Sequence, residues 1–375
     1  MNFKDILGYD TIKGYLQASV AAGRIPHAQL FVAGEGQGGL PMAIAYATLI
    51  LSEGNPRAEA QCAQLAHPDL HFAFPTATND KVKKDPVSAL FMDEWRTFVK
   101  EQPYGSLFDW FVLLGIEKKQ ANIGVNEAKE ITNKLALKSF EGGYKVMIVW
   151  MAEKMNTEAA NKLLKLLEEP AEKTLFLLVV EDENALLDTI KSRCQILRFP
   201  PLSENAIREG LEQRGLTEAE ATKIAVRAQS NFNKALQLMS NKENEEAIFE
   251  RWFIAWVRSA YRARGNKTAI QGLLQWSEEV NTVGREMQKQ FLQYCAEVFR
   301  QAFLLNYTAS SLVYMQFNDS SFELRKFAPF IHGANIEAIH RLIEEAIVHV
   351  ERNGNGKVIF TDLAIRLTRL LHAKQ

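Results

Sequence analysis

Short apolar runs alternate with helical patterns over residues 1–200, and this alternation constrains the fold more than any other feature of the sequence. Three of the runs, FVLLG, VMIVW and LFLLVV, are continuous and contain no charged residue, as expected for strands that are buried on both faces of a parallel sheet. The predicted strands are Gln29–Ala33, Trp110–Gly115, Lys145–Met151, Thr174–Val180 and Gln195–Phe199. The helices predicted between them are Pro41–Ser52, Val125–Lys138, Thr157–Glu168 and a short one near Glu183–Lys191. This order predicts an α/β domain with a parallel sheet.

After Pro200-Pro201 the strand pattern stops, and only helical patterns follow. The next predicted helices are Ser203–Arg214, Thr217–Ser230 and Asn233–Met239, and longer helical patterns run from about Asn241 with breaks at Gly265-Asn266 and around Asn318–Ser321. The sequence therefore predicts an α/β domain over residues 1–200, a small helical domain over 201–240 and a C-terminal helical domain over 241–375. A proline-containing stretch over about residues 53–103 is predicted to be an irregular insertion, with some helix near Val87–Lys100.

Charge and cysteine usage limit the functional classes. Lys and Arg total 44, Asp and Glu total 45, and the formal net charge is −1, so this chain is not expected to grip DNA by itself. Any DNA contact must come from a local patch or from a surface shared with partners. The three cysteines, Cys62, Cys194 and Cys295, lie far apart, which argues against a disulfide framework. No apolar stretch approaches the roughly 20 residues that span a bilayer, and a cytoplasmic location is expected.

A glycine-rich loop follows the first predicted strand and opens a helix. It reads Gly34-Glu35-Gly36-Gln37-Gly38-Gly39-Leu40-Pro41, with the spacing of the phosphate loop G-x-x-x-x-G-K-[ST]. In that motif the Lys neutralises phosphate charge and the hydroxyl holds Mg²⁺, but here the two positions are Leu40 and Pro41. The sequence predicts a nucleotide-binding loop that is inactive. The alternative is a plain glycine-rich turn with Pro41 in the first turn of a helix.

A second set of catalytic residues, separate from the loop, is also absent from the sequence. ATPases of this fold end the strand corresponding to Lys145–Met151 with an Asp-Glu pair that positions Mg²⁺ and water. Here Trp150 and Met151 occupy those positions, and Glu153 comes two residues late. The two losses together predict that this chain does not hydrolyse ATP.

Three further motifs point to a known family. The segment Asn156–Pro170 reads NTEAANKLLKLLEEP and closely resembles the A-x-N-x-LLK-x-LEEP signature of the clamp-loader branch of AAA+ proteins. The segment Thr189–Cys194 reads TIKSRC and is similar to the T-I-x-S-R-C motif of that branch, and Pro26–Phe31 also fits. Burial of one helical face would explain part of the first motif without any family relationship. The order and spacing of all three favour the clamp-loader family of bacterial DNA polymerase III.

The resemblance implies a specific role for Arg193. In this family the arginine of the S-R-C motif reaches the γ-phosphate of ATP on a neighbouring subunit, whereas Ser192 and Cys194 shape the turn. A surface ion pair is the ordinary alternative for such an arginine. Lys234 occupies the place of the family's second-sensor arginine, and the sensor position in the fourth strand falls among Val179, Val180 and Glu181, which again indicates a silent site.

The resemblance also implies a domain plan and a set of partners. Residues 201–240 correspond to the family's lid domain, and residues 241–375 correspond to its collar, through which the subunits assemble. The implied partners are gamma/tau and delta clamp-loader subunits, the sliding clamp and primed DNA, with ATP bound by neighbouring subunits and no cofactor on this chain. Two alternatives stay open, namely an active gamma-like AAA+ ATPase and an AAA+-derived scaffold protein outside replication.

Many family members carry a zinc module, but this sequence has only Cys62 in the corresponding region. Cys62, His67 and His71 would supply three ligands, although the usual cysteine pairs are absent. No metal site is expected, and ordinary loop histidines are the simpler interpretation.

Two segments are candidates for DNA contact. The family places helix starts against template phosphates, and the matching helix here offers Asn126 and Lys129, although Glu127 and Glu130 weigh against an anion site. The segment Arg251–Lys267 also mixes basic and aromatic residues. Because the chain as a whole is not basic, we expect a buried tryptophan face and a solvated or paired arginine stripe in that segment.

Overall fold

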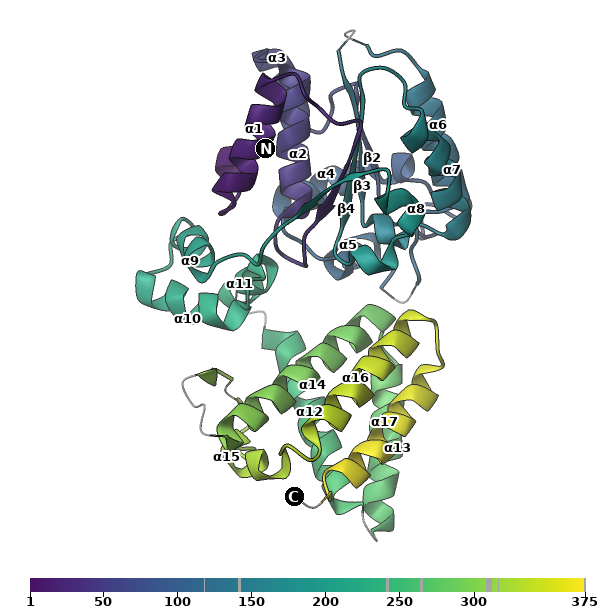
Figure 1. The fold of residues 1–375 in the computed structure, drawn as a ribbon. Helices are drawn as coiled ribbons and strands as arrows, with labels where there is room; N and C mark the ends of the chain where they lie inside the picture. The colour runs from purple at the N-terminus through teal and green to yellow at the C-terminus, as the bar shows by residue number, and fades with distance from the viewer. Residues whose placement is uncertain are drawn as a thin grey trace. The chain divides into compact units, whose positions relative to one another are not determined.

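The computed structural model describes residues 1–117, 119–140, 143–240, 243–263, 266–307, 312–315 and 317–373, without the side chains of residues 243–246. The chain forms two compact units, Met1–Ser240 and Asn241–Gln375 (Figure 1). The boundary coincides with the start of the predicted C-terminal helical domain, and residues 201–240 lie within the first unit. The separation of those residues as a domain of their own stays a prediction.

A five-stranded sheet forms the centre of the first unit. Its order is β2-β3-β4-β1-β5, and every neighbouring pair is parallel. The strands are β1 (Ala28–Val32), β2 (Leu70–Ala73), β3 (Lys145–Trp150), β4 (Thr174–Val180) and β5 (Gln195–Arg198). Every residue of β3 and β4 is buried, as expected for central strands covered on both faces. The structure confirms the predicted α/β fold with a parallel sheet.

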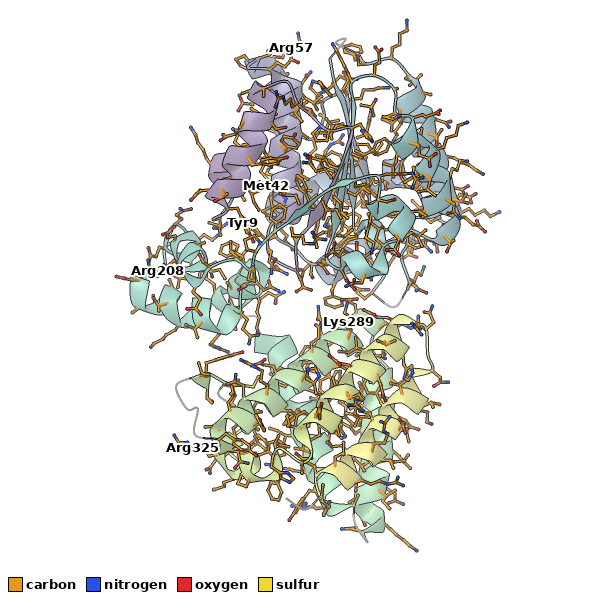
Figure 2. The ribbon with its side chains drawn as sticks, viewed as in Figure 1. Tyr9, Met42, Arg57, Arg208, Lys289 and Arg325 are labelled. Carbon is orange, nitrogen blue, oxygen red and sulfur yellow. The ribbon has the colours of Figure 1, made fainter. Side chains whose placement is uncertain are left out.

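Helices cover both faces of this sheet (Figure 1), and each face has its own core. One core joins α1 (Asp10–Ala21) and α2 (Gly39–Ser52) to the strand residues Ile148, Trp150 and Leu177. The other joins α6 (Val125–Ala136) and α7 (Thr157–Glu168) to Met147 and Val149. The side chains drawn in Figure 2 fill the space between α2 and the sheet, where Met42 is fully buried. The helices of this part are α1 (Asp10–Ala21), α2 (Gly39–Ser52), α3 (Pro56–Ala63), α4 (Met92–Glu101), α5 (Leu107–Leu114), α6 (Val125–Ala136), α7 (Thr157–Glu168) and α8 (Asp188–Lys191), with 3₁₀ turns at Phe3–Asp5, Ser88–Phe91, Ala152–Lys154 and Glu183–Ala185.

The prediction of a strand at Trp110–Gly115 was wrong, because this segment belongs to helix α5. Ser106 and Asp109 form a capping box that starts the helix, and Gly115 ends it in a left-handed conformation. Trp110 is fully buried and its Nε1 donates to the Pro75 carbonyl at 2.9 Å, whereas Val112 is 47% exposed. A short apolar run does not distinguish a buried strand from a buried helix.

The fifth strand of the sheet is instead β2, which the sequence analysis did not predict. It lies inside the stretch that the sequence predicts to be an irregular insertion. Leu70–Ala73 pairs with β3 in parallel register, with Leu70 opposite Val146 and Ala73 opposite Val149. Only four residues form this edge strand, and the segment lacks the long apolar run that marks the central strands. The predicted helix near Val87–Lys100 is confirmed as a 3₁₀ turn followed by α4.

The predicted small helices over residues 201–240 are confirmed, and each begins at a side-chain cap. They are α9 (Glu204–Glu212), α10 (Glu218–Ala228) and α11 (Phe232–Met239). Ser203, Thr217 and Asn231 accept hydrogen bonds from the first-turn amides of these helices. We call these three helices the lid. Their shared core includes Ile207, Leu211 and Phe232 together with Leu7 and Tyr104 from the first 200 residues.

In its described part, the second unit contains helices and no strand. Its helices are α12 (Glu243–Arg262), α13 (Lys267–Asn281), α14 (Arg285–Asn306), α15 (Leu324–Phe327), α16 (Ile336–Glu351) and α17 (Gly356–Leu370), with a 3₁₀ turn at Ala328–Phe330. At the predicted break Gly265-Asn266, Gly265 lies outside the described residues, and Asn266 caps α13. The predicted break around Asn318–Ser321 falls between α14 and α15. No helix in the described ranges is both long and apolar enough to cross a membrane.

Candidate functional site

The glycine-rich loop links β1 to α2 as predicted, and hydrogen bonds between its own residues hold it. Gly36 and Gly38 have φ angles of 67° and 83°, which favour glycine. The Gly34 amide donates to Gln37 Oε1 at 3.0 Å, and the Gln37 amide donates to the Gly34 carbonyl at 3.0 Å. Thus two backbone amides of the loop already have hydrogen-bond partners within the loop.

The two positions that carry the chemistry in active loops are part of the protein core. Leu40 is 4% exposed and Pro41 is buried, both in the first turn of α2. Gly39 in front of them is also closely packed, because a Cβ atom there would lie 2.9 Å from the Ala33 Cβ. These positions provide neither a cation for phosphate charge nor a hydroxyl for Mg²⁺.

The lid is hydrogen-bonded directly to this loop. Asn231 Nδ2 donates to Glu35 Oε1 at 2.9 Å, and the Phe232 amide donates to the Gly36 carbonyl at 3.1 Å. A Cβ atom on Gly36 would lie 1.9 Å from Asn231 Oδ1, so this close approach requires glycine. Lys234, the predicted second-sensor position, lies in the first turn of α11, where its amide donates to Asn231 Oδ1 at 2.9 Å.

Tyr104 fills space above the loop and was not identified from the sequence. Its hydroxyl accepts the Leu7 amide at 2.9 Å, and its ring lies 5.0 Å from that of Phe232 in an edge-to-face arrangement. A Cβ atom on Gly38 would come within 2.8 Å of the Tyr104 ring. Tyr104 therefore connects the N-terminal segment, the loop and the lid. Burial raises the pKa of its hydroxyl above the usual value.

A hollow remains over the loop. It has about 330 Å³ of space between atoms, part of it open solvent, and its lining includes the loop glycines, Leu40, Pro41, Tyr104 and the ends of β3 and β4. Glu181 and the buried Tyr104 are the ionisable residues among those that line it. The hollow thus lacks a cationic side chain for a polyphosphate.

The end of β3 is apolar, as the sequence indicates. Trp150 is 3% exposed, and its ring lies 5.3 Å from Trp95 and 5.5 Å from Phe98. Trp150 thus belongs to an aromatic cluster supplied by the stretch that was predicted to be irregular. Met151 is buried in a left-handed conformation.

The late carboxylate Glu153 has a structural contact. Its Oε1 accepts the Glu181 amide at 3.0 Å, which connects the segment after β3 to the end of β4. Val179 and Val180, at the predicted sensor position, are buried core residues of β4. The positions where active members carry the Asp-Glu pair and the strand-four sensor are therefore occupied by apolar side chains, namely Trp150, Met151, Val179 and Val180.

Arg193 lies in the turn between α8 and β5, and its side chain is 32% exposed. Nε donates to Glu168 Oε1 at 2.9 Å, and Nη2 contacts the same oxygen. Nη1 donates to the Thr189 carbonyl at 2.7 Å and to Ser192 Oγ at 3.3 Å. The neighbouring Cys194 packs against the core that α6 and α7 form with the sheet, and burial raises the pKa of its thiol to about 12.

The structure does not group Cys62, His67 and His71, the three side chains that were weighed as zinc ligands although no metal site was expected. Among the described residues, no group of three or more His, Cys, Asp or Glu side chains is placed to hold a metal ion. His67 Nδ1 accepts the Asp69 amide at 3.1 Å. His71 lies in β2, where burial and the nearby Lys134 ammonium lower its pKa to about 4.

The predicted DNA-contact residues lie at the start of α6, but they are already bonded. Asn126 Nδ2 donates to Asp85 Oδ1 at 2.9 Å, and Lys129 Nζ lies 3.4 Å from Asn126 Oδ1. Glu127 is 2% exposed and accepts the Ser88 amide at 2.5 Å, and burial raises its pKa. Glu127 is therefore not a surface charge that would repel DNA, as the sequence suggests. Asp85, however, places a different carboxylate beside Asn126.

In the second candidate segment the aromatic face is buried. Trp252 and Trp256 are 3% and 0% exposed, and Trp256 stacks on Trp276 with 5.1 Å between ring centroids. Arg251 pairs with Glu279 at 2.8 Å, and Arg258 Nη2 donates to the Ser321 carbonyl at 2.7 Å. The buried tryptophan face and the bonding of these two arginines match the expectation from the sequence.

Comparison with known proteins supports the family indicated by the motifs. The chain is 29% identical over 239 residues to DNA polymerase III subunit delta' of Bacillus subtilis, a match that covers 62% of this chain and 59% of that relative. It is 45% identical over 86 residues to DNA polymerase III subunit delta' of Yersinia pestis, which covers 23% of this chain and 25% of that relative. The chain therefore aligns with less than two thirds of the length of either relative.

Among solved structures, a DNA polymerase III gamma subunit-related protein from Thermotoga maritima is 15% identical, with a TM-score of 0.38, and the alignment covers 96% of this chain and 99% of that one. The family model described as DNA polymerase III, delta subunit, matches residues 9–203, which is more than half of the chain. This chain belongs to that DNA polymerase III subunit family.

Proposed function

We propose that this chain is a non-hydrolysing, delta-prime-type subunit of the bacterial replicative clamp loader. In this role it works in the cytoplasm with gamma/tau and delta subunits, and it helps to load the sliding clamp onto primed DNA within the DNA polymerase III holoenzyme. It supplies Arg193 to ATP on a neighbouring subunit and binds no cofactor of its own. One observation carries the proposal above the others: Leu40 and Pro41, which replace the catalytic loop residues, are buried in the core.

The absence of hydrolysis follows from what phosphoryl transfer requires. Catalysis depends on a cation at the β- and γ-phosphates, a held Mg²⁺ and a positioned water. The loop offers Leu40 and Pro41, and the end of β3 offers Trp150 and Met151. Tyr104 further occupies space next to Gly38. These replacements lie on three separate segments, so restoring one of them would not restore the site.

Arg193 has the properties that a trans-acting arginine needs. Its guanidinium stays charged at all relevant pH values and presents a planar fork to phosphate oxygens. The side chain is anchored beside a short helix yet remains 32% exposed, so a second subunit has access to it. The motif identity of the surrounding turn and the family membership support this role.

The test is the ATPase rate of the clamp loader assembled from this chain and its cognate gamma and delta subunits, with clamp and primed DNA present. Arg193→Ala should lower the rate about tenfold or more, since arginine fingers contribute on the order of 10³–10⁵ at a single site. Arg198→Ala is the matched control, because Arg198 lies close in sequence and forms an ion pair with Glu183 at 2.8 Å.

The contrary outcomes separate the alternatives. An unchanged rate for Arg193→Ala would mean that Arg193 is a structural ion-pair residue, and a scaffold role outside replication would then remain. ATP turnover by this chain alone would contradict the non-hydrolysing assignment and favour a gamma-like ATPase. A similar loss for Arg198→Ala would show that the assay responds to general damage in this region.

A further inference from the structure

The guanidinium group of Arg193 is held by its own chain on each of its nitrogen atoms. Nε and Nη2 face one oxygen of Glu168, and Nη1 faces the Thr189 carbonyl and the Ser192 hydroxyl. A guanidinium has five N–H donors, and these contacts occupy most of them. In this arrangement Arg193 cannot offer a phosphate two parallel N–H groups without giving up a present partner.

Glu168 lies at the end of a helix that packs firmly against the sheet. It is the last residue of α7, and that helix is anchored on the sheet by Ala160, Leu163 and Leu167. The Glu168 side chain is 48% exposed, so its carboxylate is not committed to the protein core. The helix end therefore presents a carboxylate at a fixed place beside the turn that carries Arg193.

We propose that Glu168 is a positioning residue, which holds the Arg193 side chain on its own subunit until a nucleotide phosphate on the neighbouring subunit replaces the carboxylate. This inference rests on the proposed function, because it requires Arg193 to reach nucleotide on another subunit. Carboxylate and phosphate compete for the same guanidinium fork. Since both side chains are partly exposed, the pair opposes release by only about two- to fivefold. A bound nucleotide is thus sufficient to displace Glu168.

Glu168→Gln tests the proposal in the complete clamp loader, with the ATPase rate measured against ATP concentration. Glutamine keeps the length and volume of the side chain but removes the charge that competes with phosphate. The half-saturating ATP concentration should fall about two- to fivefold, while the maximal rate stays within about twofold of wild type. Glu169→Gln removes the same charge one residue further along the chain and should leave both quantities unchanged.

An unchanged half-saturating concentration for Glu168→Gln would overturn the proposal, and so would a lower maximal rate at unchanged half-saturation. Glu169→Gln behaving like Glu168→Gln would do the same, because the effect would then be a general one of surface charge. In the double variant Glu168→Gln/Arg193→Ala the effect of the glutamine should disappear, since there is no guanidinium left to release.

The single variant Arg193→Ala distinguishes a failure of the role of Glu168 from a failure of the proposed function. If it lowers the ATPase rate while Glu168→Gln behaves as wild type, only the role of Glu168 is wrong. If Arg193→Ala leaves the rate unchanged, the proposed function fails and the role of Glu168 fails with it.

Discussion

At the scale of single residues, Gly36 shows that glycines of a phosphate loop can be required for a reason other than phosphate. Its carbonyl accepts the Phe232 amide, and a Cβ atom on Gly36 would lie 1.9 Å from Asn231 Oδ1. We expect Gly36→Ala to destabilise the protein, because the alanine would both strain the backbone at a φ of 67° and push Asn231 away from the loop.

Gly23→Ala separates these two causes. Gly23 has a φ of 64°, but a Cβ atom there would have open space around it. Gly23→Ala should cost about 1 kcal/mol from backbone strain alone, and Gly36→Ala should cost about 2 kcal/mol more, from the lost packing and hydrogen bonds of the lid. Urea unfolding of both variants measures the difference, and equal losses would show that the contact with Asn231 contributes nothing.

The sequence shows which motif positions have lost their catalytic residue types, but it does not show which other residues now fill the site. Leu40, Pro41, Trp150 and Met151 occupy motif positions, so their apolar character can be interpreted from spacing alone. Tyr104 belongs to no motif, and its contacts with Leu7 and the lid join residues far apart in the chain. Only the folded structure brings those residues together.

At the scale of elements, β2 contains a titrating group that should make stability depend on pH. Burial and Lys134 lower the pKa of His71 to about 4, whereas an unfolded chain has a His pKa near 6.5. Between about pH 6.5 and pH 4 the unfolded chain therefore binds more protons than the folded protein, so stability falls as the pH falls. Over that range wild type should lose up to about 3 kcal/mol more unfolding free energy than His71→Gln, which does not titrate.

Denaturant unfolding of both proteins over this pH range gives the two stability profiles. Other titrating groups, including the nearby Asp69 and Lys145, are present in both proteins and largely cancel in the difference. Parallel profiles for wild type and His71→Gln would contradict the prediction, because they would mean that His71 has the same pKa in the folded and unfolded chain.

Helices and strands were predicted correctly where the sequence has a long amphipathic pattern or a long apolar run with distinct ends. The helix Thr157–Glu168 was predicted to its end residues, and the buried strands β3 and β4 were found from their apolar runs. The run at Trp110–Gly115 has the apolar composition of a buried strand, but it belongs to a helix that begins at the capping box of Ser106 and Asp109. Local pattern therefore does not decide such a run, whereas capping and tertiary packing do.

At the scale of the whole molecule, each hydrophobic core of the described residues falls within one of the two units. Among those residues, three cores lie within residues 1–240, and a fourth lies in the residues that follow. The core of the lid, however, includes Leu7 and Tyr104 from outside the lid. We therefore expect residues 1–240 to fold without the rest of the chain, and residues 1–200 to be less stable because they lose the packing of Tyr104 against Phe232.

Thermal unfolding of the two fragments, followed by tryptophan fluorescence, tests this expectation. Trp95, Trp110 and Trp150 are buried in the first unit, so the emission of both fragments reports on the same core. The fragment 1–240 should unfold cooperatively, and the fragment 1–200 should melt at least about 2 °C lower, since a loss of about 1 kcal/mol shifts Tm by roughly 2–4 °C at this size. Equal melting temperatures would mean that the lid adds no stability to the α/β part. Absence of a cooperative transition in the fragment 1–240 would mean that the first unit needs the second in order to fold.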